Sequence, residues 1–479
     1  MLFNSIDFAI FLPIVFILYW FVTNKNLKLQ NLLIVISSYI FYGWWDWRFL
    51  SLILFSTILD YSIGISLSKQ VNQNKRKMLL WISILMNLGF LGFFKYYNFF
   101  LANFMTAFSF FGTEINANSL NIILPVGISF YTFQTLSYTI DVYKRQLETT
   151  KDFIAFSAFV SFFPQLVAGP IERATNLLPQ FYTKRYFDYS KTVDGMRQIL
   201  WGLFKKIVIA DNCAQYANII FNNSSEYSGS TLVLGAIFFT FQIYGDFSGY
   251  SDIAIGTSRL FGFNLKQNFA FPYFSRDIAE FWRRWHISLS SWFRDYLYIP
   301  LGGSRGRTKN KIRNVFIIFL VSGFWHGANW TFIIWGALNA LYFLPIFITN
   351  NNRNNLNIVA QGKYLPNLKE FLLMSLTFIL TVYAWIFFRA ENIGHAISYI
   401  NNIFSPTLFE SSEIFPLGLL LLILFFLSIE WMNRNKQYGL EKFNKQKFKF
   451  LDVLLLYIIF WSIVIWNSSK EVEFIYFQF

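Results

Sequence analysis

Residues 313–349 read RNVFIIFLVSGFWHGANWTFIIWGALNALYFLPIFIT, and this stretch decides the class of fold. It holds two successive apolar runs, 313–330 and 331–349, each close to the roughly 20 residues with which a helix crosses a bilayer. Between Arg313 and the end of the second run, His326 is the one side chain that ordinarily titrates near neutral pH. The pattern predicts two membrane-spanning helices and places one imidazole inside the membrane.

The composition of the whole chain agrees with a membrane location. Of its 479 residues, 55% are hydrophobic and 14% are charged, whereas soluble domains carry about 25% charged residues. We predict an all-α polytopic membrane protein that forms a single integral-membrane domain over residues 1–479. The length rule gives about 10–13 crossings, and further candidate spans lie near 6–22, 30–46, 50–68, 79–111, 120–142, 153–169, 196–212, 230–247, 367–388, 413–431 and 450–467.

The basic residues predict an orientation. Lys and Arg number 40 against 26 Asp and Glu, a net charge of +14, and they cluster in short loops at 69–77, 304–313 and 434–449. Cytoplasmic loops of membrane proteins carry such an excess, so we expect these loops inside. The loops at 113–119 and 391–412 contain no Lys or Arg and are expected outside. The basic loops also attract anionic lipids, and we expect membrane lipids rather than nucleic acid as partners.

Cysteine and histidine are scarce. The single Cys213 excludes a disulfide framework, and three histidines far apart in sequence do not have the spacing of a metal site. We therefore expect no bound metal, and we interpret Cys213 as a packing residue and His395 as a surface residue of the outer loop.

Residues 273–299, YFSRDIAEFWRRWHISLSSWFRDYLYI, are too charged to span the membrane. Large apolar side chains recur there at helical spacing, which predicts one amphipathic helix that lies in the interface or plugs the bundle; they are Phe281, Trp285, Leu289, Trp292 and Tyr296. His286 lies within this segment. By itself it is expected to contact lipid headgroups, and its case as a site residue depends on the helix folding back towards His326.

His326 is the strongest candidate for catalysis. It lies twelve residues after Asn314, about 18 Å along a helix, and an ionisable group at that depth is by default functional. Desolvation keeps an imidazole neutral, as a general base that activates a hydroxyl requires. Gly323 and Gly327 leave room for a substrate or for a close helix. The alternative is a structural His that joins two helices by a hydrogen bond.

The stretch YGDFSGYSDIAIG, residues 244–256, places Asp246 and Asp252 next to an apolar run. Either carboxylate could orient an imidazole or hold an arginine such as Arg283, and a salt bridge that packs the bundle is an equal alternative. The Gly and Ser residues fit a broken helix, which at membrane depth must be buried or line a cavity.

These motifs are similar to those of the membrane-bound O-acyltransferase (MBOAT) family, in its bacterial AlgI, PatA and DltB branch. The resemblance rests on DFSGYSDIAIG, FWRRWHISLSSWFRDYLYIPLGG and FWHGANWTFIIWG, with support from MLFNSIDFAIFLPIVF, FFPQLVAGPIER and FIYFQF. One departure is visible, since many relatives read Leu-His-Gly where this chain has Leu338-Asn339-Ala340.

The resemblance implies an MBOAT-type bundle around a central tunnel with interfacial helices, and a catalytic core near 120–350. The family's catalytic His falls on His326 and a second recurrent His on His286, with Asp246, Asp252, Arg283, Trp325 and Asn329 as supporting or tunnel residues. The donor would be a cytoplasmic thioester, acetyl-CoA or an acyl carrier protein, with no bound cofactor.

The resemblance also implies an acceptor and a place in the cell. The acceptor would be a hydroxyl of an extracytoplasmic polysaccharide, reached directly or through an exported SGNH-type partner. The protein would lie in the bacterial cytoplasmic (inner) membrane as a multi-pass enzyme.

Two other classes of function stay open at this point. Polytopic bundles with broken helices also suit an acyl-group transporter or channel without covalent chemistry, although we find no internal repeat. A scaffold that only recruits the exported partner is the third possibility, and it predicts that replacing His326 has no effect.

Overall fold

The computed structural model describes all residues except 116, 168, 442–448, 468–473 and 476–479. Parts of the loops 113–119 and 434–449, of the candidate span 153–169 and of the ending FIYFQF therefore lie outside the described residues. Through the described residues the chain is helical and contains no strand, which confirms the all-α prediction.

The chain divides into two compact units. Unit 1 comprises residues 1–192 and 257–265, and unit 2 comprises residues 193–256 and 266–479. Each unit is described by itself below. The single domain over 1–479, with a catalytic core near 120–350, stays a prediction.

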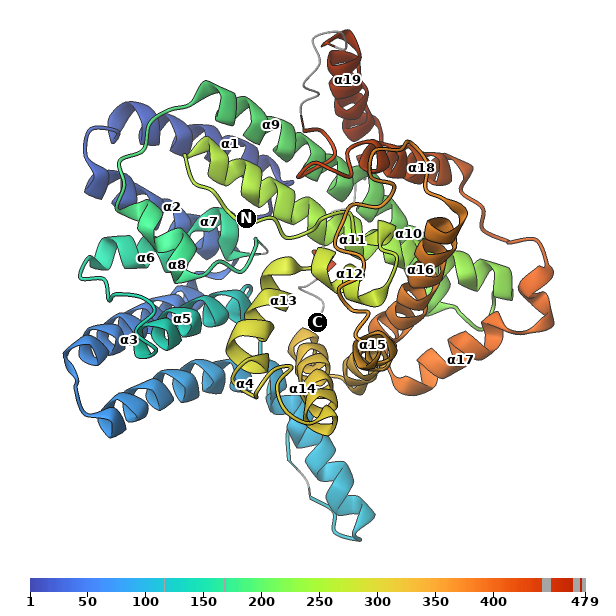
Figure 1. Ribbon diagram of the computed structural model, residues 1–479, viewed down its shortest axis with the longest axis horizontal. Helices are drawn as coiled ribbons and strands as arrows, with labels where there is room; N and C mark the ends of the chain where they lie inside the picture. The colour runs from blue at the N-terminus through green and yellow to red at the C-terminus, as the bar shows by residue number, and fades with distance from the viewer. Residues whose placement is uncertain (116, 168, 442–448, 468–473, 476–479) are drawn as a thin grey trace. The chain divides into compact units, whose positions relative to one another are not determined.

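Unit 1 is built from the N-terminal helices, labelled in Figure 1. They are α1 (Ile6–Ile17) with its π-helical extension η1 (Leu18–Val22), α2 (Leu27–Asp46), η2 (Trp47–Phe49), α3 (Leu50–Lys69), α4 (Gln73–Phe110), α5 (Ile128–Tyr143), α6 (Phe153–Ser161), α7 (Phe163–Leu166), α8 (Ala174–Leu177) and η3 (Leu178–Phe181). Helix α9 (Tyr189–Leu203) begins in unit 1 and ends in unit 2.

Unit 2 holds the remaining helices. They are the π-helical η4 (Phe204–Ala210), α10 (Asp211–Asn222), α11 (Gly229–Leu260), η5 (Pro272–Phe274), α12 (Ile278–Arg284), α13 (Ile287–Phe293), η6 (Arg294–Tyr298), α14 (Thr308–His326), α15 (Trp330–Ile348), α16 (Leu368–Arg389), α17 (Ile393–Ile403), η7 (Pro406–Phe409), α18 (Leu417–Met432) and α19 (Lys449–Ile465). The last turn of α11 belongs to unit 1.

Several helices are long and apolar enough to cross a membrane. Among the described residues these are the segments Leu27–Lys69, Gln73–Phe110, Gly229–Leu260, Trp330–Ile348 and Leu368–Arg389, and shorter apolar helices lie at 6–22, 153–166, 417–432 and 450–465. The expected spans 30–46 and 50–68 correspond to α2 and α3, which are separated at Asp46, where the backbone is extended, and the span expected at 120–142 begins only at Ile128.

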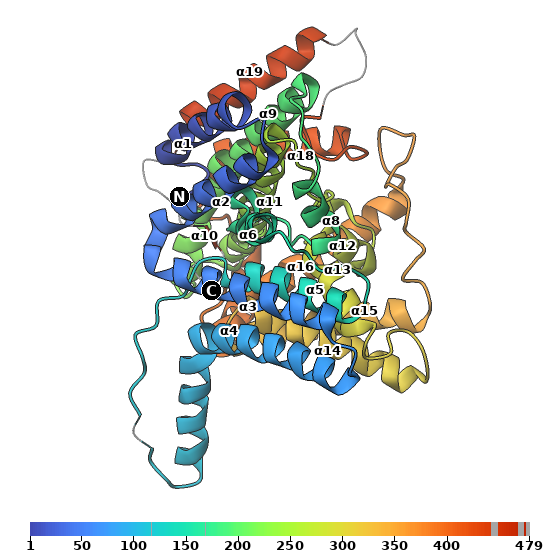
Figure 2. The same cartoon turned by 90° about the vertical axis from the view of Figure 1, so that its left-hand side faces the viewer.

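Helices α3, α4 and α5 of unit 1 run side by side (Figure 2) and share a buried polar cluster. The Asp60 carboxylate accepts hydrogen bonds from the hydroxyls of Ser83 and Thr139 and from the Asn87 amide. Because every donor comes from a neighbouring helix, the cluster fixes the register of the three helices.

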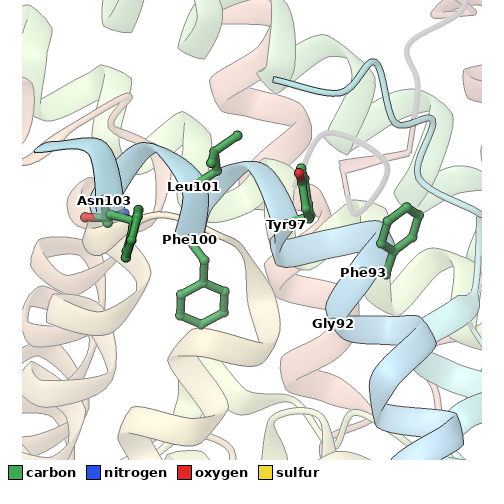
Figure 3. A pocket seen from close by; sticks show the side chains of 7 residues that line it. Gly92, Phe93, Tyr97, Phe100, Leu101 and Asn103 are labelled. Carbon is green, nitrogen blue, oxygen red and sulfur yellow. The ribbon is translucent and has the colours of Figure 1, made fainter. Parts of the chain in front are cut away.

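Helix α4 changes direction partway along its length (Figure 2). An added Cβ at Gly89 or Gly92 would meet no atom within 4 Å, so these glycines are not needed for packing, and they weaken the helix at this point. Beyond Gly92, aromatic side chains line an open groove of about 730 Å³ (Figure 3).

Helix α11 runs without interruption from Gly229 to Leu260, so the predicted break in residues 244–256 is wrong. The small residues serve close packing instead. A Cβ on Gly249 would lie 2.8 Å from the Gly202 carbonyl oxygen, and one on Gly245 would lie 2.9 Å from the Lys205 carbonyl oxygen. Glycine therefore lets α11 approach the α9–η4 segment closely.

The predicted single helix over 273–299 is also wrong, because the chain breaks at His286, whose φ is +42°. The physical reason is pairing with a distant segment. The Ala270 N–H donates to the Arg284 carbonyl, and the Ile287 N–H donates to the Asn268 carbonyl. These bonds divide the segment into α12, α13 and η6.

Candidate active site

His326 is the last residue of α14 and is 3% exposed. Its imidazole is surrounded by aromatic rings, with ring-centroid distances of 5.0 Å to Trp325, 5.1 Å to Trp335 and 5.2 Å to Phe388. These rings come from α14, α15 and α16, which are neighbours in unit 2 (Figure 1). The ring is therefore held in a dry aromatic site, where an electrostatic interaction is stronger than in water.

Glycines bring α15 close to the helix that carries His326. A Cβ on Gly323 would overlap the Phe332 carbonyl oxygen, and one on Gly336 would overlap the Phe319 carbonyl oxygen. A Cβ on Gly327 would overlap the Phe332 ring. Of the two interpretations offered for Gly323 and Gly327, the structure shows the close helix.

A short connection fixes the position of His326 relative to α15. Gly327 ends α14 in an extended conformation, with φ −166°. Asn329 then caps α15, because its side-chain oxygen accepts from the Thr331 N–H at 3.1 Å while its amide donates to the Glu391 carbonyl at 2.7 Å. Asn329 thus acts as a helix cap in this structure.

His286 is 1% exposed and is oriented by Asn268. The Asn268 Oδ1 atom lies 3.1 Å from the His286 Nδ1 atom and accepts from both the N–H and the hydroxyl of Ser288, while the Asn268 amide donates to Ser251. An oxygen that accepts from a backbone N–H is an acceptor towards Nδ1 as well. The hydrogen of His286 therefore sits on Nδ1, and Nε2 carries the lone pair.

The Nε2 atom of His286 has no hydrogen-bond partner among the described residues. Burial lowers the pKa of His286 to about 3, so its ring is neutral near pH 7 and Nε2 is available as an acceptor.

The two histidines meet at one indole. Trp325 lies between them, with ring-centroid distances of 6.1 Å to His286 and 5.0 Å to His326. The segment that carries His286 therefore does fold back towards His326, which was the condition for treating His286 as a site residue. Phe247 of α11 closes the other side of His286, at 4.6 Å.

The acidic candidates pair with lysines and not with Arg283 or an imidazole. Asp246 lies 2.9 Å from the Lys206 ammonium, and Asp252 lies 2.6 Å from the Lys205 ammonium. Arg283 donates to the backbone carbonyls of Asn352 and Asn355. The expectation that a carboxylate of 244–256 holds Arg283 is wrong, and the salt-bridge interpretation of both aspartates is confirmed.

The buried ion pairs extend to further groups. Lys206 also lies 2.8 Å from Asp211, and Asp246 accepts from the Ile475 N–H at 2.7 Å. Lys205 and Lys206 were not singled out from the sequence, although two charges inside the expected span 196–212 should have pointed to buried partners.

Asn268 and Asn339 were missed as well. Asn339 stands at the departure from the family pattern, where its Oδ1 accepts from the Trp282 indole at 3.2 Å and its amide donates to the Trp335 carbonyl. It thereby orders two rings of the aromatic cluster. Nothing in the sequence indicated that either asparagine would be buried and would order neighbouring side chains.

His395 is half-buried and not a free surface residue. Its Nε2 lies 3.4 Å from the Ser224 hydroxyl, and its ring meets the Phe221 and Tyr399 rings edge to face, each at 6.4 Å. Cys213 is fully buried, as expected of a packing residue.

A cavity of about 250 Å³ opens beside α14 within unit 2. Its lining includes Ser322, one helical turn before His326, together with Ser304, Arg294 and Arg353. Aromatic side chains, among them Phe319 and Phe343, also line the cavity.

Comparison with known proteins gives a consistent result. The sequence pattern of the MBOAT, membrane-bound O-acyltransferase family, matches residues 144–386. A probable alginate O-acetylase AlgI of Pseudomonas aeruginosa is 41% identical over 416 residues, 86% of this chain and 77% of that protein.

Two other relatives are named for different polymers. A peptidoglycan O-acetyltransferase of Helicobacter pylori is 35% identical, over 84% of this chain and 79% of its own. A teichoic acid D-alanyltransferase of Bacillus subtilis is 30% identical, over 46% of this chain and 58% of its own.

Proposed function

The chain belongs to the membrane-bound O-acyltransferase family, and on that premise we propose that it transfers an acetyl group from a cytoplasmic thioester to a hydroxyl of a cell-envelope polysaccharide. It is an O-acyltransferase and a multi-pass membrane protein. The donor, the immediate acceptor and the inner membrane as its location belong to the proposal. Relatives named for alginate and peptidoglycan O-acetylation support acetyl and an envelope polymer.

The observation that carries the proposal is the environment of His326. A buried imidazole at the end of α14, in an aromatic site that it shares with His286 through Trp325, suits proton transfer in a space that excludes water. Both histidines lie in motifs through which the chain resembles the family.

In the proposed reaction His326 acts as a general base. It takes the proton of the acceptor hydroxyl while the oxygen attacks the thioester carbonyl, which forms a C–O bond and then breaks the C–S bond. The imidazolium returns the proton to the departing thiolate, so the enzyme ends unchanged. A transient acyl group on His326 is the variant of this scheme.

His286 would assist through Nε2. This atom carries the lone pair, lies in the same aromatic cluster and has no hydrogen-bond partner among the described residues. It can therefore accept a hydrogen bond from a substrate hydroxyl and position it, while Trp325 sets the spacing between the rings. Asp246, Asp252 and Asn329 act indirectly, by holding α11 and α15 in place.

The cavity beside α14 supports entry of the donor from the cytoplasmic side. Its lining combines the cations Arg294 and Arg353 and the first residue of the basic loop 304–313 with apolar side chains and with Ser322, one turn before His326. Positive charge in this lining suits the phosphates of coenzyme A or the acidic surface of an acyl carrier protein.

An exported SGNH-type protein would complete transfer to the polymer. An acyl group that leaves a membrane enzyme still has to reach a polymer outside, and the outer loops expected at 113–119 and 391–412 are short. The partner remains part of the proposal.

The enzymatic class removes the transporter and the scaffold as primary interpretations, and one experiment tests the mechanism. Purified protein in sealed proteoliposomes is given external acetyl-CoA labelled in the acetyl group, and release, transfer or uptake of the label is followed. We expect His326→Ala to abolish turnover and His395→Ala, a histidine outside the aromatic site, to retain it. Full activity of His326→Ala would refute the mechanism, and passage of intact acetyl-CoA without hydrolysis would favour a transporter.

A further inference from the structure

A second groove lies in unit 1, at the end of the first apolar segment. It has a volume of about 360 Å³, which is within the range of small-molecule sites. Its apolar wall comprises Phe16, Trp20, Phe21, Tyr186 and Phe187, and the proposed chemistry does not use it.

The polar part of this groove is positively charged. Lys25, Lys184 and Arg185 line it together with Asn24, and its lining contains no Asp or Glu. The acidic residue that follows it in sequence, Asp188, already accepts from the backbone N–H groups of Ser190 and Lys191. The groove therefore presents three cations without a carboxylate among its lining residues.

Arg185 is the cation of the groove that is buried and held in place by hydrogen bonds. It is 6% exposed, so its charge is removed from water, and its neutral partners are the Asn31 side chain at 2.7 Å and the Gln180 carbonyl at 3.1 Å. The guanidinium also lies over the Phe263 ring at 4.7 Å. Its buried Nε–H has no hydrogen-bond acceptor among the described residues.

A buried charge is costly unless an opposite charge accompanies it. No ion pair of Arg185 occurs among the described residues, so the groove provides a place for an anion from outside the chain. The same geometry holds the guanidinium rigidly, which lowers the entropy lost when an anion binds.

The position of the groove indicates which kind of anion it binds. Segment 6–22 is an apolar helix, and the groove is formed where this helix ends and Lys25 follows. If this helix crosses the bilayer, as its apolar composition predicts, the groove lies near the membrane surface. The rings of Phe21 and Phe187 are more than half exposed, beside the cationic groups. Apolar rings next to cations at this level match a phosphate attached to acyl chains.

We propose that this groove binds the phosphate headgroup of an anionic phospholipid of the leaflet that faces the basic loops. Lys25, Lys184 and Arg185 hold the phosphate, and the acyl chains lie along Phe21 and Phe187. The site is independent of the acyltransferase reaction. It ties the end of the first helix to the segment 184–187 through a lipid.

The test uses the full chain in detergent micelles and phosphatidylglycerol as the probe, with bound lipid counted by native mass spectrometry. Each basic residue near an anionic headgroup contributes about fivefold in affinity, so Lys25→Ala with Lys184→Ala should weaken binding about 25-fold. The matched control is Lys28→Ala, because Lys28 is exposed, close in sequence and absent from the groove.

Arg185→Gln should lose binding further, and the double lysine variant keeps the test valid if this variant does not fold. The proposal is overturned if the double variant retains phosphatidylglycerol as well as the control, or if phosphatidylcholine binds equally. Displacement of phosphatidylglycerol by millimolar inorganic phosphate or coenzyme A would also overturn it, in favour of a soluble phosphate ligand.

Discussion

Removing the Asn268 side chain should disable the second histidine of the site. In Asn268→Ala, the Nδ1–H of His286 and the N–H of Ser288 lose their acceptor. Each buried donor left unsatisfied costs about 1–3 kcal/mol, so the free energy of unfolding should fall by about 2–6 kcal/mol. A misplaced His286 should lower kcat by about 10²-fold.

Two further variants separate positioning from packing. Ser251→Ala removes only the acceptor of the Asn268 amide, at 3.0 Å, and should cost about 1–3 kcal/mol for this one buried donor with little loss of kcat. Asn268→Asp keeps an acceptor for His286 and adds a negative charge beside it, which should raise the pKa of His286 from about 3.

The pH dependence follows from that shift. In the wild type, folded His286 protonates only near pH 3, whereas the unfolded chain protonates near 6.5. The stability that depends on this residue is therefore present above pH 6.5 and falls as the pH decreases towards 3. Asn268→Asp should narrow the pH range over which stability falls. It should also move the acid limb of the kcat/KM profile to higher pH.

Two assays test these predictions. One follows transfer of the acetyl label from acetyl-CoA as a function of pH, and the other follows thermal unfolding of the protein in detergent micelles. If Asn268→Ala keeps the wild-type unfolding temperature and kcat, the hydrogen-bond assignment around His286 is wrong. If Asn268→Asp leaves the pH profile unchanged, His286 takes no part in handling substrate protons.

Two other predictions concern helix packing. Lys206→Ala leaves the buried carboxylates of Asp211 and Asp246 without their shared cation, so the free energy of unfolding should fall by about 3–5 kcal/mol; an unchanged urea midpoint would contradict this. Gly323→Val forces a side chain against the α15 backbone and should cost about 1–3 kcal/mol, whereas Gly89→Ala, which meets open space, should be neutral or stabilising in the same unfolding assay.

Local pattern in the sequence was sufficient for most of the helices, and it singled out His326 as a candidate. Apolar runs of membrane length predicted most of the long helices, because burial in lipid depends on the composition of each segment alone. His326 stood out because it is an imidazole well inside an apolar run. Its aromatic surroundings could not be predicted, since Trp335 and Phe388 come from other helices.

The two wrong predictions, one helix over 273–299 and a break in 244–256, arose where segments apart in the sequence interact. The helical periodicity of 273–299 is real, but backbone pairing with residues 268–270 overrides it at His286. Similarly, the glycines of 244–256 indicated a break when only α11 was considered. They serve contact with the α9–η4 segment, and nothing within α11 itself distinguishes these two uses of glycine.

The paired lysines of η4 have a consequence for how this protein can evolve. Lys205 and Lys206 are neighbours in sequence, yet each reaches a different aspartate on α11, at positions 252 and 246. Loss of either lysine strands a buried carboxylate, and Lys206 serves Asp211 as well as Asp246, so neutral drift cannot pass through single substitutions of the lysines. Descendants should either keep both lysines or replace each together with its aspartate partners, and such joint replacements would mark lineages that diverged long ago.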